Sequence, residues 1–263
     1  NQLLQKKFFQ KKTLSKMSLK NKYAVITGCN KGIGKETVRV FSENGSNIFA
    51  CVRKIDKNFT NYIKKLEKKF KNKIFAIELD FSDKNLVKSA ASKILNYKKD
   101  ITILVNNAGA IETSLFQMSS MKNFYNIFEV NYFNQTLFTQ YILKSITKSK
   151  NGSIVYISST ASIDGNIGRN IYAASKAAIS SQAKVLSREL GRLNIRVNVV
   201  APGLVNTEMM KKNTPQKIID EVVSNSSLKR SGNPSEIAET ILFLCSNKSS
   251  FITGQIIRVD GGM

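Results

Sequence analysis

Short apolar runs alternate with longer helical patterns along almost the whole chain, and this alternation limits the folds open to it. Apolar runs rich in Val and Ile are typical of strands buried on both faces of a parallel sheet. The stretches between them are long enough for helices that cross over from one such strand to the next. We expect strands at residues 23–27, 46–52, 74–79, 101–105, 154–157, 195–200 and 255–259.

This alternation predicts an α/β fold with a single domain. The expected architecture is a doubly wound parallel sheet of the Rossmann type, with helices on both faces and ligands at the carboxyl ends of the strands. One helix is expected to begin near Lys84, with Ser82 as its cap. The other helices are expected at residues 35–44, 59–70, 124–141, 172–192 and 235–246.

Two segments depart from the regular alternation. Residues 1–16 are basic and free of acidic side chains, and two explanations are open: the remnant of an organelle-targeting peptide, or sequence upstream of a start at Met17. The folded domain would then occupy residues 17–263. Within it, the polar stretch 204–228 is expected to form a mobile lid over a substrate, and we refer to it as the lid.

The chain contains no histidine, which excludes histidine-based triads and most zinc and iron sites. Proton chemistry must therefore use other side chains, and we expect no metal. Cys29, Cys51 and Cys245 are widely spaced without a CxxC pair and are predicted to be buried, reduced thiols. We expect a cytoplasmic protein, or an organellar one if residues 1–16 are a targeting remnant.

The formal net charge is +23 at pH 7. A compositional bias toward Lys and Asn, attraction to an acidic partner, and nucleic-acid binding would each account for it. No recognised nucleic-acid motif accompanies the charge, and no apolar run is long enough to span a membrane. We therefore expect neither a nucleic-acid nor a membrane partner.

A glycine-rich turn follows the first expected strand. Residues 28–34 read GCNKGIG and lead directly into a helical stretch. A turn of this kind brings backbone N–H groups and a helix N-terminus close to a phosphate. The glycines Gly28, Gly32 and Gly34, placed between a strand and a helix, predict a dinucleotide site.

The end of the second expected strand bears on the choice of cofactor. A carboxylate there would accept hydrogen bonds from the adenosine ribose and repel a 2′-phosphate. This strand instead ends in Arg53 and Lys54. Arg53 is placed to pair with a 2′-phosphate, assisted by Lys31 or Lys54, which favours NADP(H) over NAD(H). Two solvated cations in a lysine-rich protein are the other interpretation.

Polar side chains also follow later strands. Asp80 ends the third strand, where it could accept a hydrogen bond from the adenine amine. Residues 106–109 (NNAG) follow the fourth strand and suit a turn beside a ligand, although they suit an ordinary turn equally well. Asn131 interrupts an apolar helical pattern, so it needs hydrogen-bond partners inside the protein.

Residues 172–176 (YAASK) place a tyrosine and a lysine four positions apart. In a helix, such residues lie on one face. A phenol has an ordinary pKa of about 10, and a nearby ammonium is expected to lower it. Tyr172 and Lys176 are therefore candidates for a general acid/base pair near neutral pH.

Taken together, these residues resemble the short-chain dehydrogenase/reductase family. The resemblance extends from about Leu19 to Met263. It rests on a set of motifs that occur in the family's order: residues 27–34 (TGxxxGxG), residues 106–109 (NNAG), Asn131, Ser159, residues 172–176 (YxxxK) and residues 202–203 (PG).

The resemblance implies a role for each residue of the candidate active site. Tyr172 would protonate the substrate oxygen during carbonyl reduction, and Lys176 would hold the nicotinamide ribose. Ser159, thirteen residues before the tyrosine, is preferred to Ser158 as the hydrogen-bond partner of the carbonyl, and Asn131 would hold a relay water. The cofactor contacts implied are Gly28, Asn30, Lys31, Gly32, Ile33, Gly34, Arg53, Asp80, Phe81, Asn107, Ala108, Gly109, Tyr172, Lys176, Pro202, Gly203, Val205 and Thr207.

Within the family, residues 228–238 and the C-terminal stretches are similar to the 3-oxoacyl-acyl-carrier-protein reductases of fatty acid synthesis. That likeness implies NADPH-dependent reduction of a 3-oxoacyl thioester and a homotetramer built on the long helices. An acidic carrier protein would suit the basic surface, with Lys150 as one docking cation. The second docking position holds Leu193, beside Arg192. After Gly109 those reductases usually carry an Arg-Asp pair, whereas residues 110–112 of this chain read AIE.

Two alternatives remain open at this point. A dehydrogenase acting on a sugar, a nucleotide-sugar or another small ketone or alcohol would use the same chemistry on a different substrate. A nucleotide-binding scaffold without catalysis would predict loss of the catalytic set. Asn131, Ser159, Tyr172 and Lys176 are all present, which favours an enzyme.

Overall fold

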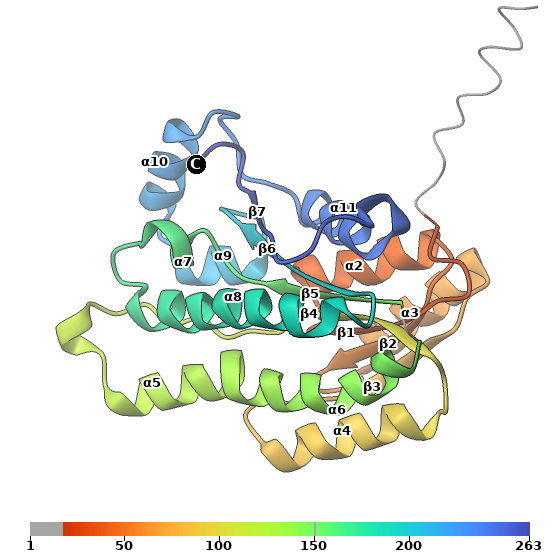
Figure 1. Cartoon of the computed structure of the whole chain (residues 1–263). Coiled ribbons are helices and arrows are strands. Elements are labelled where there is room, and N and C mark those ends of the chain that lie inside the picture. Colours follow the sequence, from red (N-terminus) through yellow and green to blue (C-terminus); the bar gives the residue numbers. More distant parts are fainter. Residues whose placement is uncertain (1–17, 150) are drawn as a thin grey trace, which may run out of the picture.

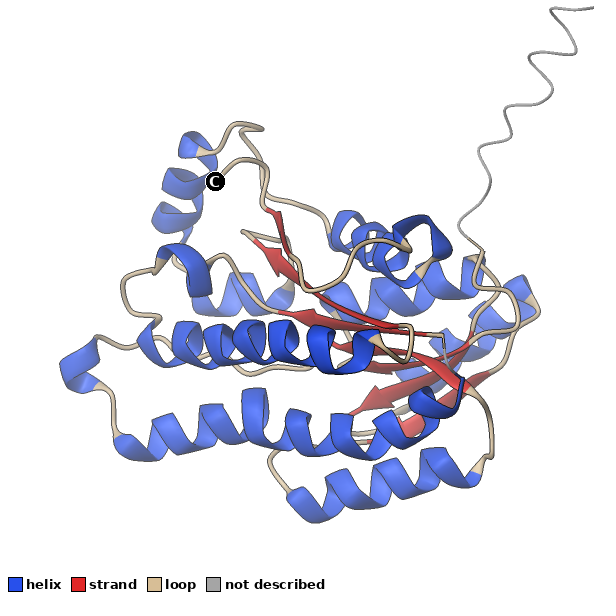
Figure 2. Ribbon diagram, viewed as in Figure 1, coloured by secondary structure: helices blue, strands red, loops and turns tan. Residues whose placement is uncertain are grey.

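The computed structural model describes residues 18–149 and 151–263. The predictions for residues 1–16 and for Lys150 lie outside this range. Seven strands form one sheet, which lies between two layers of helices (Figures 1 and 2). The strands are β1 (Tyr23–Thr27), β2 (Asn47–Val52), β3 (Ile74–Glu78), β4 (Ile101–Asn106), β5 (Gly152–Ile157), β6 (Ile195–Pro202) and β7 (Ile256–Val259).

All neighbouring strands pair in parallel, in the order β3-β2-β1-β4-β5-β6-β7. The order reverses between β1 and β4, and such a reversal opens a crevice at the carboxyl ends of the strands. The predicted doubly wound, Rossmann-type α/β domain is therefore confirmed. Each expected strand is present, with ends that differ by a few residues.

The two helical layers cover opposite faces of the sheet. One layer contains α2 (Gly32–Glu43), α3 (Lys57–Phe70) and α11 (Pro234–Cys245). The other contains α4 (Lys84–Asn96), α6 (Asn134–Ser149) and α8 (Asn170–Gly191), in front of the sheet in Figure 1. The shorter helical segments of the described residues are η1 (Phe116–Met118), α5 (Met121–Phe128), η2 (Glu129–Phe133), α7 (Ala161–Asp164), α9 (Glu208–Asn213), α10 (Gln216–Asn225) and η3 (Asn247–Ser249).

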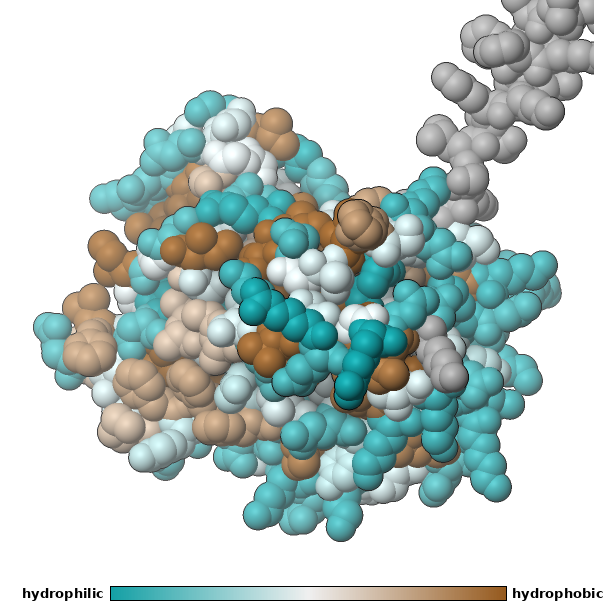
Figure 3. Space-filling view, in the orientation of Figure 1, coloured by the Kyte–Doolittle hydropathy of each residue, from teal (hydrophilic) through white to brown (hydrophobic). Residues whose placement is uncertain are grey.

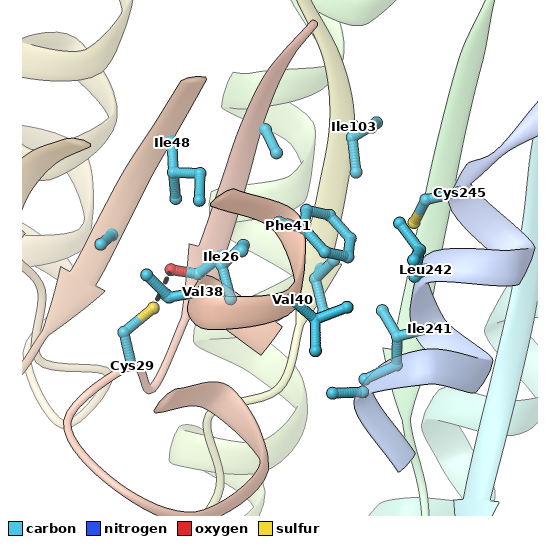
Figure 4. Close-up of a cluster of buried hydrophobic side chains, with 14 of the residues drawn as sticks. Ile26, Cys29, Val38, Val40, Phe41, Ile48, Ile103, Ile241, Leu242 and Cys245 are labelled. Atoms are coloured by element: carbon cyan, nitrogen blue, oxygen red, sulfur yellow. Dashed lines mark hydrogen bonds between the residues drawn. The ribbon is translucent and has the colours of Figure 1, made fainter. Parts of the chain in front are cut away.

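The strands are apolar throughout because both faces of the sheet are covered. In β1, Ala24 and Ile26 face the core under α2 and α11, whereas Val25 faces the core under α6 and α8, as the alternation of side chains along a strand requires. Figure 4 shows the first of these cores, where Phe41 of α2 packs beside Leu242 of α11. These two close-packed hydrophobic cores hold the ends of the strands in fixed positions.

The three cysteines are free and buried, as predicted. Cys29 donates from its Sγ to the carbonyl oxygen of Ile26 at 3.0 Å (Figure 4). Burial raises the pKa of the Cys245 thiol to about 12, so this thiol stays protonated and unreactive at neutral pH. In the described part of the chain, no helix combines the length and the apolarity that a membrane crossing needs.

Two helix predictions are wrong in detail. The helix expected over residues 124–141 is instead α5 followed by a π-helical turn, η2 (Glu129–Phe133), and then by α6. The expected cap of α4 is Ser82, but Asp83 takes this position and accepts from Asn85 N at 2.7 Å. Ser82 is unavailable because its N–H and hydroxyl both donate to Asp80.

Candidate active site

The candidate residues gather at the carboxyl edge of the sheet, around the reversal between β1 and β4. The glycine turn follows β1, and residues 107–109 follow β4. Ser159 follows β5, the neighbour of β4, and Gly203 follows β6. Adjacent parallel strands therefore bring segments far apart in the sequence to one edge.

The glycine turn packs tightly against the turn after β4. Gly28 has a φ of 72°, and a Cβ there would lie 2.9 Å from Ala108 Cα. Thr27 Oγ1 accepts from the N–H groups of Asn107 and Ala108, both at 3.0 Å. Asn107 Nδ2 donates to Thr27 O at 2.9 Å and to Gly28 O at 3.2 Å. This network fixes the two turns as one rigid unit.

The N-terminus of α2 opens directly from the glycine turn. Its cap residue, Lys31, makes no side-chain hydrogen bond to the first turn, so the cap residue leaves the N–H groups there to other acceptors. A helix N-terminus with free N–H groups and glycines on its approach fits a dinucleotide pyrophosphate. Asn30 is exposed, and Gly32 and Ile33 are partly exposed, beside this opening.

Arg53 lies just beyond the end of β2, the strand paired with β1, and it is exposed. Cys29 N donates to Cys51 O at 3.0 Å, so the end of β2 lies beside the glycine turn. Lys31 is also exposed but pairs with Glu208 of α9, at 2.9 Å. An exposed pair of this kind is weak, so it leaves Lys31 available to a ligand.

Three predicted cofactor contacts have structural duties as well. Phe81 is buried, and its ring packs edge-on against Phe138 at 5.8 Å, so only its backbone is free to meet a ligand. Asp80 Oδ1 accepts from Ser82. Val205 is buried and pairs as an isolated bridge with Gly232.

The segment after β6 completes the edge. Pro202 ends β6, and Gly203 donates from its N–H to Val259 O at 3.1 Å. Thr207 caps α9 by accepting from Met210 N. A Cβ on Gly32 would lie 3.2 Å from Thr207 Cγ2. The start of the lid is therefore next to the glycine turn.

Asn131 is fully buried in the π-helical turn η2, a local widening often found at functional sites. Its Oδ1 accepts from Ala110 N at 2.7 Å. Its Nδ2 donates to Ala110 O at 2.9 Å and to Ser175 Oγ at 3.0 Å. Asn131 has the internal partners expected of it, and it ties the turn after β4 to α8.

Tyr172 and Lys176 lie one turn apart near the start of α8, as their spacing predicts. Lys176 is buried, with 3% of its surface exposed, and its Nζ donates to Ile157 O at 2.8 Å. This Nζ is 5.9 Å from the centroid of the Tyr172 ring. A Cβ on Gly109 would lie 3.1 Å from the same Nζ, so Lys176 also reaches the turn after β4.

The two serines after β5 have different surroundings. Ser158 is buried, and its Oγ donates to Lys176 O at 3.0 Å and bonds with the hydroxyls of Ser162 and Ser180. Ser159 is partly exposed and lies close enough to Tyr172 to act on the pKa of its phenol. Its geometry therefore favours Ser159 as the serine that faces a substrate.

The pKa values of the pair differ from the expectation. Burial raises the pKa of the Tyr172 phenol, although the hydrogen bond from Ser159 and the charge of Arg169 act in the opposite direction. The pKa is therefore raised rather than lowered as expected, and Lys176 is not among the groups that shift it. Burial also lowers the pKa of Lys176 to about 8.

Sequence reasoning missed three residues that shape the site. Thr27 joins the two turns, and Gln135 Nε2 holds the turn after β4 by donating to Ala108 O at 2.6 Å. Arg169 lies close enough to Tyr172 for its charge to act on the phenol. Thr27 belongs to the TGxxxGxG motif, although its role in joining the two turns was not predicted. Arg169 precedes Tyr172 by three residues, about one helical turn.

Three features together define a nicotinamide-dependent oxidoreductase of the Rossmann type: the order of the parallel strands, the glycine turn after β1, and the pair of Tyr172 and Lys176. Residues 28–263 match a family model described as enoyl-(acyl carrier protein) reductase. A short-chain dehydrogenase/reductase structure superposes with a TM-score of 0.80 at 27% identity, covering 93% of this chain and 98% of that one. The chain belongs to the short-chain dehydrogenase/reductase family.

Within this family, the chain is similar to individual proteins along nearly its whole length. The 3-oxoacyl-acyl-carrier-protein reductase FabG of Thermotoga maritima is 36% identical, covering 94% of this chain and 99% of that protein. The 7alpha-hydroxysteroid dehydrogenase of Escherichia coli K12 is 32% identical, covering 94% and 95%. A solved 7alpha-hydroxysteroid dehydrogenase, in complex with NADH and 7-oxo glycochenodeoxycholic acid, has a TM-score of 0.86 at 32% identity, covering 94% of this chain and 95% of that one.

Proposed function

We propose that this protein reduces the 3-oxo group of an acyl thioester carried on acyl-carrier protein, with NADPH as the hydride donor. The observation that carries the proposal is the grouping of Ser159, Tyr172 and Lys176 beside the glycine turn at one sheet edge. The likeness to the FabG reductases along nearly the full length of both chains supports the choice of substrate.

Each residue has a defined task in the proposed reduction. A bound nicotinamide supplies the hydride. Tyr172 protonates the oxygen, and its raised pKa keeps the phenol in the acid form at neutral pH. Ser159 donates a hydrogen bond to the developing alkoxide. Lys176 uses one of its three hydrogens on Ile157 O, which leaves two for ribose hydroxyls.

Asn131 is less free to hold a relay water than the resemblance implies. Both hydrogens of its side-chain amide are occupied, by Ala110 O and Ser175 Oγ. A relay water would therefore have to bind at the second lone pair of Oδ1 or at a backbone carbonyl. We assign Asn131 mainly to positioning the turn after β4 against α8.

The proposed preference for NADPH rests on Arg53. Arg53→Ala removes the exposed guanidinium at the end of β2, and a charge-assisted phosphate contact contributes about 1.5–3 kcal/mol. We expect the Kd for NADPH to rise about 10- to 100-fold and the Kd for NADH to stay nearly constant, both measured by fluorescence titration. Lys54→Ala is the matched control, with a smaller effect. Equal weakening of both cofactors by Arg53→Ala would refute the phosphate contact.

The net positive charge of the chain supports acyl-carrier protein as the proposed partner. Acyl-carrier protein is the proposed acidic partner for a chain of net charge +23. Arg192, at the end of α8, is exposed and lies next to Leu193, which holds the second docking position. The three buried free thiols are compatible with the cytoplasmic location that we propose.

An oxosteroid or another small ketone is the alternative substrate class, favoured by the likeness to 7alpha-hydroxysteroid dehydrogenase. NADPH oxidation should be followed with an acetoacetyl thioester of acyl-carrier protein, beside a 7-oxo steroid and sugar-nucleotide ketones. Faster turnover of the thioester is the expected result. Turnover of a steroid or sugar ketone alone would keep the mechanism and replace the substrate.

We also propose that the protein is a homotetramer. The exposed apolar side chains Met121 and Tyr125 of α5, Phe133 of η2 and Val185 of α8 support this. Figure 3 shows apolar surface gathered over α5 and near α7, and exposed apolar patches often mark contacts between proteins. Light scattering is expected to give about four times the chain mass of 29.4 kDa. A monomeric mass at micromolar concentration would contradict the proposal.

A further inference from the structure

The lid is attached to the domain with little packing. Its helices α9 and α10 contain no buried residue, so the hydrophobic burial that holds the other helices contributes little here. Residues 207–208 meet the glycine turn at one end, through Thr207 beside Gly32 and through Glu208 with Lys31. The position of the middle of the lid must therefore depend on polar contacts.

Arg169 supplies those contacts. Its Nη2 donates to Asn213 O at 2.7 Å and to Thr214 Oγ1 at 3.1 Å, at the junction of α9 and α10. Among the described residues, no other side chain outside the lid donates a hydrogen bond to residues 209–223. Arg169 thus connects the middle of the lid to the body of the domain.

The same arginine also holds the segment after β4. Its Nη1 donates to Thr113 Oγ1, and its backbone pairs with Ser114 as an isolated parallel bridge. A guanidinium has a planar fork of donors, which lets one side chain fix two partners at a set angle. Arg169 therefore joins two segments, the middle of the lid and residues 113–114 after β4.

Arg169 is also structurally coupled to the candidate acid. It is the cap residue of α8, and its carbonyl oxygen accepts from Ala173 N at 2.7 Å, in the turn that carries Tyr172. A shift of the Arg169 backbone would consequently move the helix start on which the phenol stands. The side chain fixes the lid, while the main chain fixes the catalytic turn.

We propose that Arg169 is a positioning residue that latches the lid, through Asn213 and Thr214, to the start of α8 and so closes the lid over a substrate held at Tyr172. This inference rests on the proposed reduction for its substrate. The latch itself is a property of the protein and does not depend on which carbonyl compound is bound.

Kinetics of matched variants test the latch. Arg169→Gln should raise the KM for the oxo substrate about tenfold, a loss expected for a charge-assisted contact. The kcat and the Kd for NADPH should change less than about threefold, because ground-state closure is lost rather than the acid. Arg169→Lys keeps the charge without the fork and should recover only part of the KM. Arg188→Gln, on the exposed surface of α8, is the control without effect.

A double-mutant cycle gives a sharper test. Thr214→Val removes one acceptor of the latch and should raise the KM by a smaller factor. In Arg169→Gln it should have almost no further effect, because the partner is already gone. Full additivity of the two substitutions would overturn the proposal.

Hydrogen–deuterium exchange in the NADPH-bound protein provides a readout that needs no substrate. Amides of residues 209–223 should exchange about tenfold faster in Arg169→Gln, since local opening becomes easier, while amides of the sheet remain unchanged. Unchanged exchange of the lid would refute the latch. Faster exchange without turnover of any thioester would keep the latch and refute the proposed substrate.

Discussion

Tyr172→Phe is expected to lower kcat by about three orders of magnitude, in the range that a positioned general acid contributes. The phenylalanine ring fills the same space on α8 and leaves the burial of Lys176 unchanged, so only the proton donor and the Ser159 contact are lost. The Kd for NADPH is expected to change less than about threefold. Steady-state kinetics and fluorescence titration measure the two quantities separately.

Tyr156 offers a matched control for this substitution. It is a buried tyrosine of β5 whose hydroxyl donates to Thr139 Oγ1 at 3.3 Å, within the core under α6 and α8. Tyr156→Phe removes the same atom and is expected to cost about 1 kcal/mol of stability, with kcat nearly unchanged. If Tyr172→Phe kept substantial turnover, Tyr172 would not be the acid.

Lys176 is expected to set the alkaline limit of the reduction. Its pKa of about 8 means that the ammonium is charged below pH 8 and neutral above it. The raised pKa keeps Tyr172 protonated over that range, so the tyrosine does not limit the rate there. The kcat/KM for reduction should therefore fall as pH rises through about 8, when the charge beside the developing alkoxide is lost.

Two substitutions at this position separate charge from shape. Lys176→Met removes the charge at every pH and is expected to reduce kcat about 100-fold or more and to weaken NADPH binding. Lys176→Arg retains a charge at all accessible pH values, so the decline near pH 8 should disappear, whatever the remaining activity. An identical decline in Lys176→Arg would show that another group titrates.

Much of the fold followed from the sequence because its strands lie between two apolar cores. Burial on both faces makes a strand such as β2 apolar at nearly every position, and this pattern can be recognised from the sequence. The π-helical turn around Asn131 was not predictable. It adds one residue to a helical turn, and no residue type marks such an insertion.

The sequence predicted those parts of the candidate active site whose geometry depends on the spacing of residues along the backbone. The helical spacing of Tyr172 and Lys176, and the glycines of the first turn, act through positions that a sequence fixes. The pKa of Tyr172 depends on the competition between burial and charge, which only three-dimensional surroundings decide. The reach of Arg169 to Thr214 joins segments 45 residues apart, and no local pattern reveals it.

Transfer of deuterium tests the central claim most directly. The protein would be incubated with an acetoacetyl thioester of acyl-carrier protein and NADPH deuterated at C4 of the nicotinamide, in each of its two stereoisomers. The account predicts a 3-hydroxyacyl product that carries one deuterium at C3 with one stereoisomer, and almost none with Tyr172→Phe. Unchanged thioester, beside deuterium transfer to a 7-oxo steroid, would contradict the assignment as a 3-oxoacyl thioester reductase.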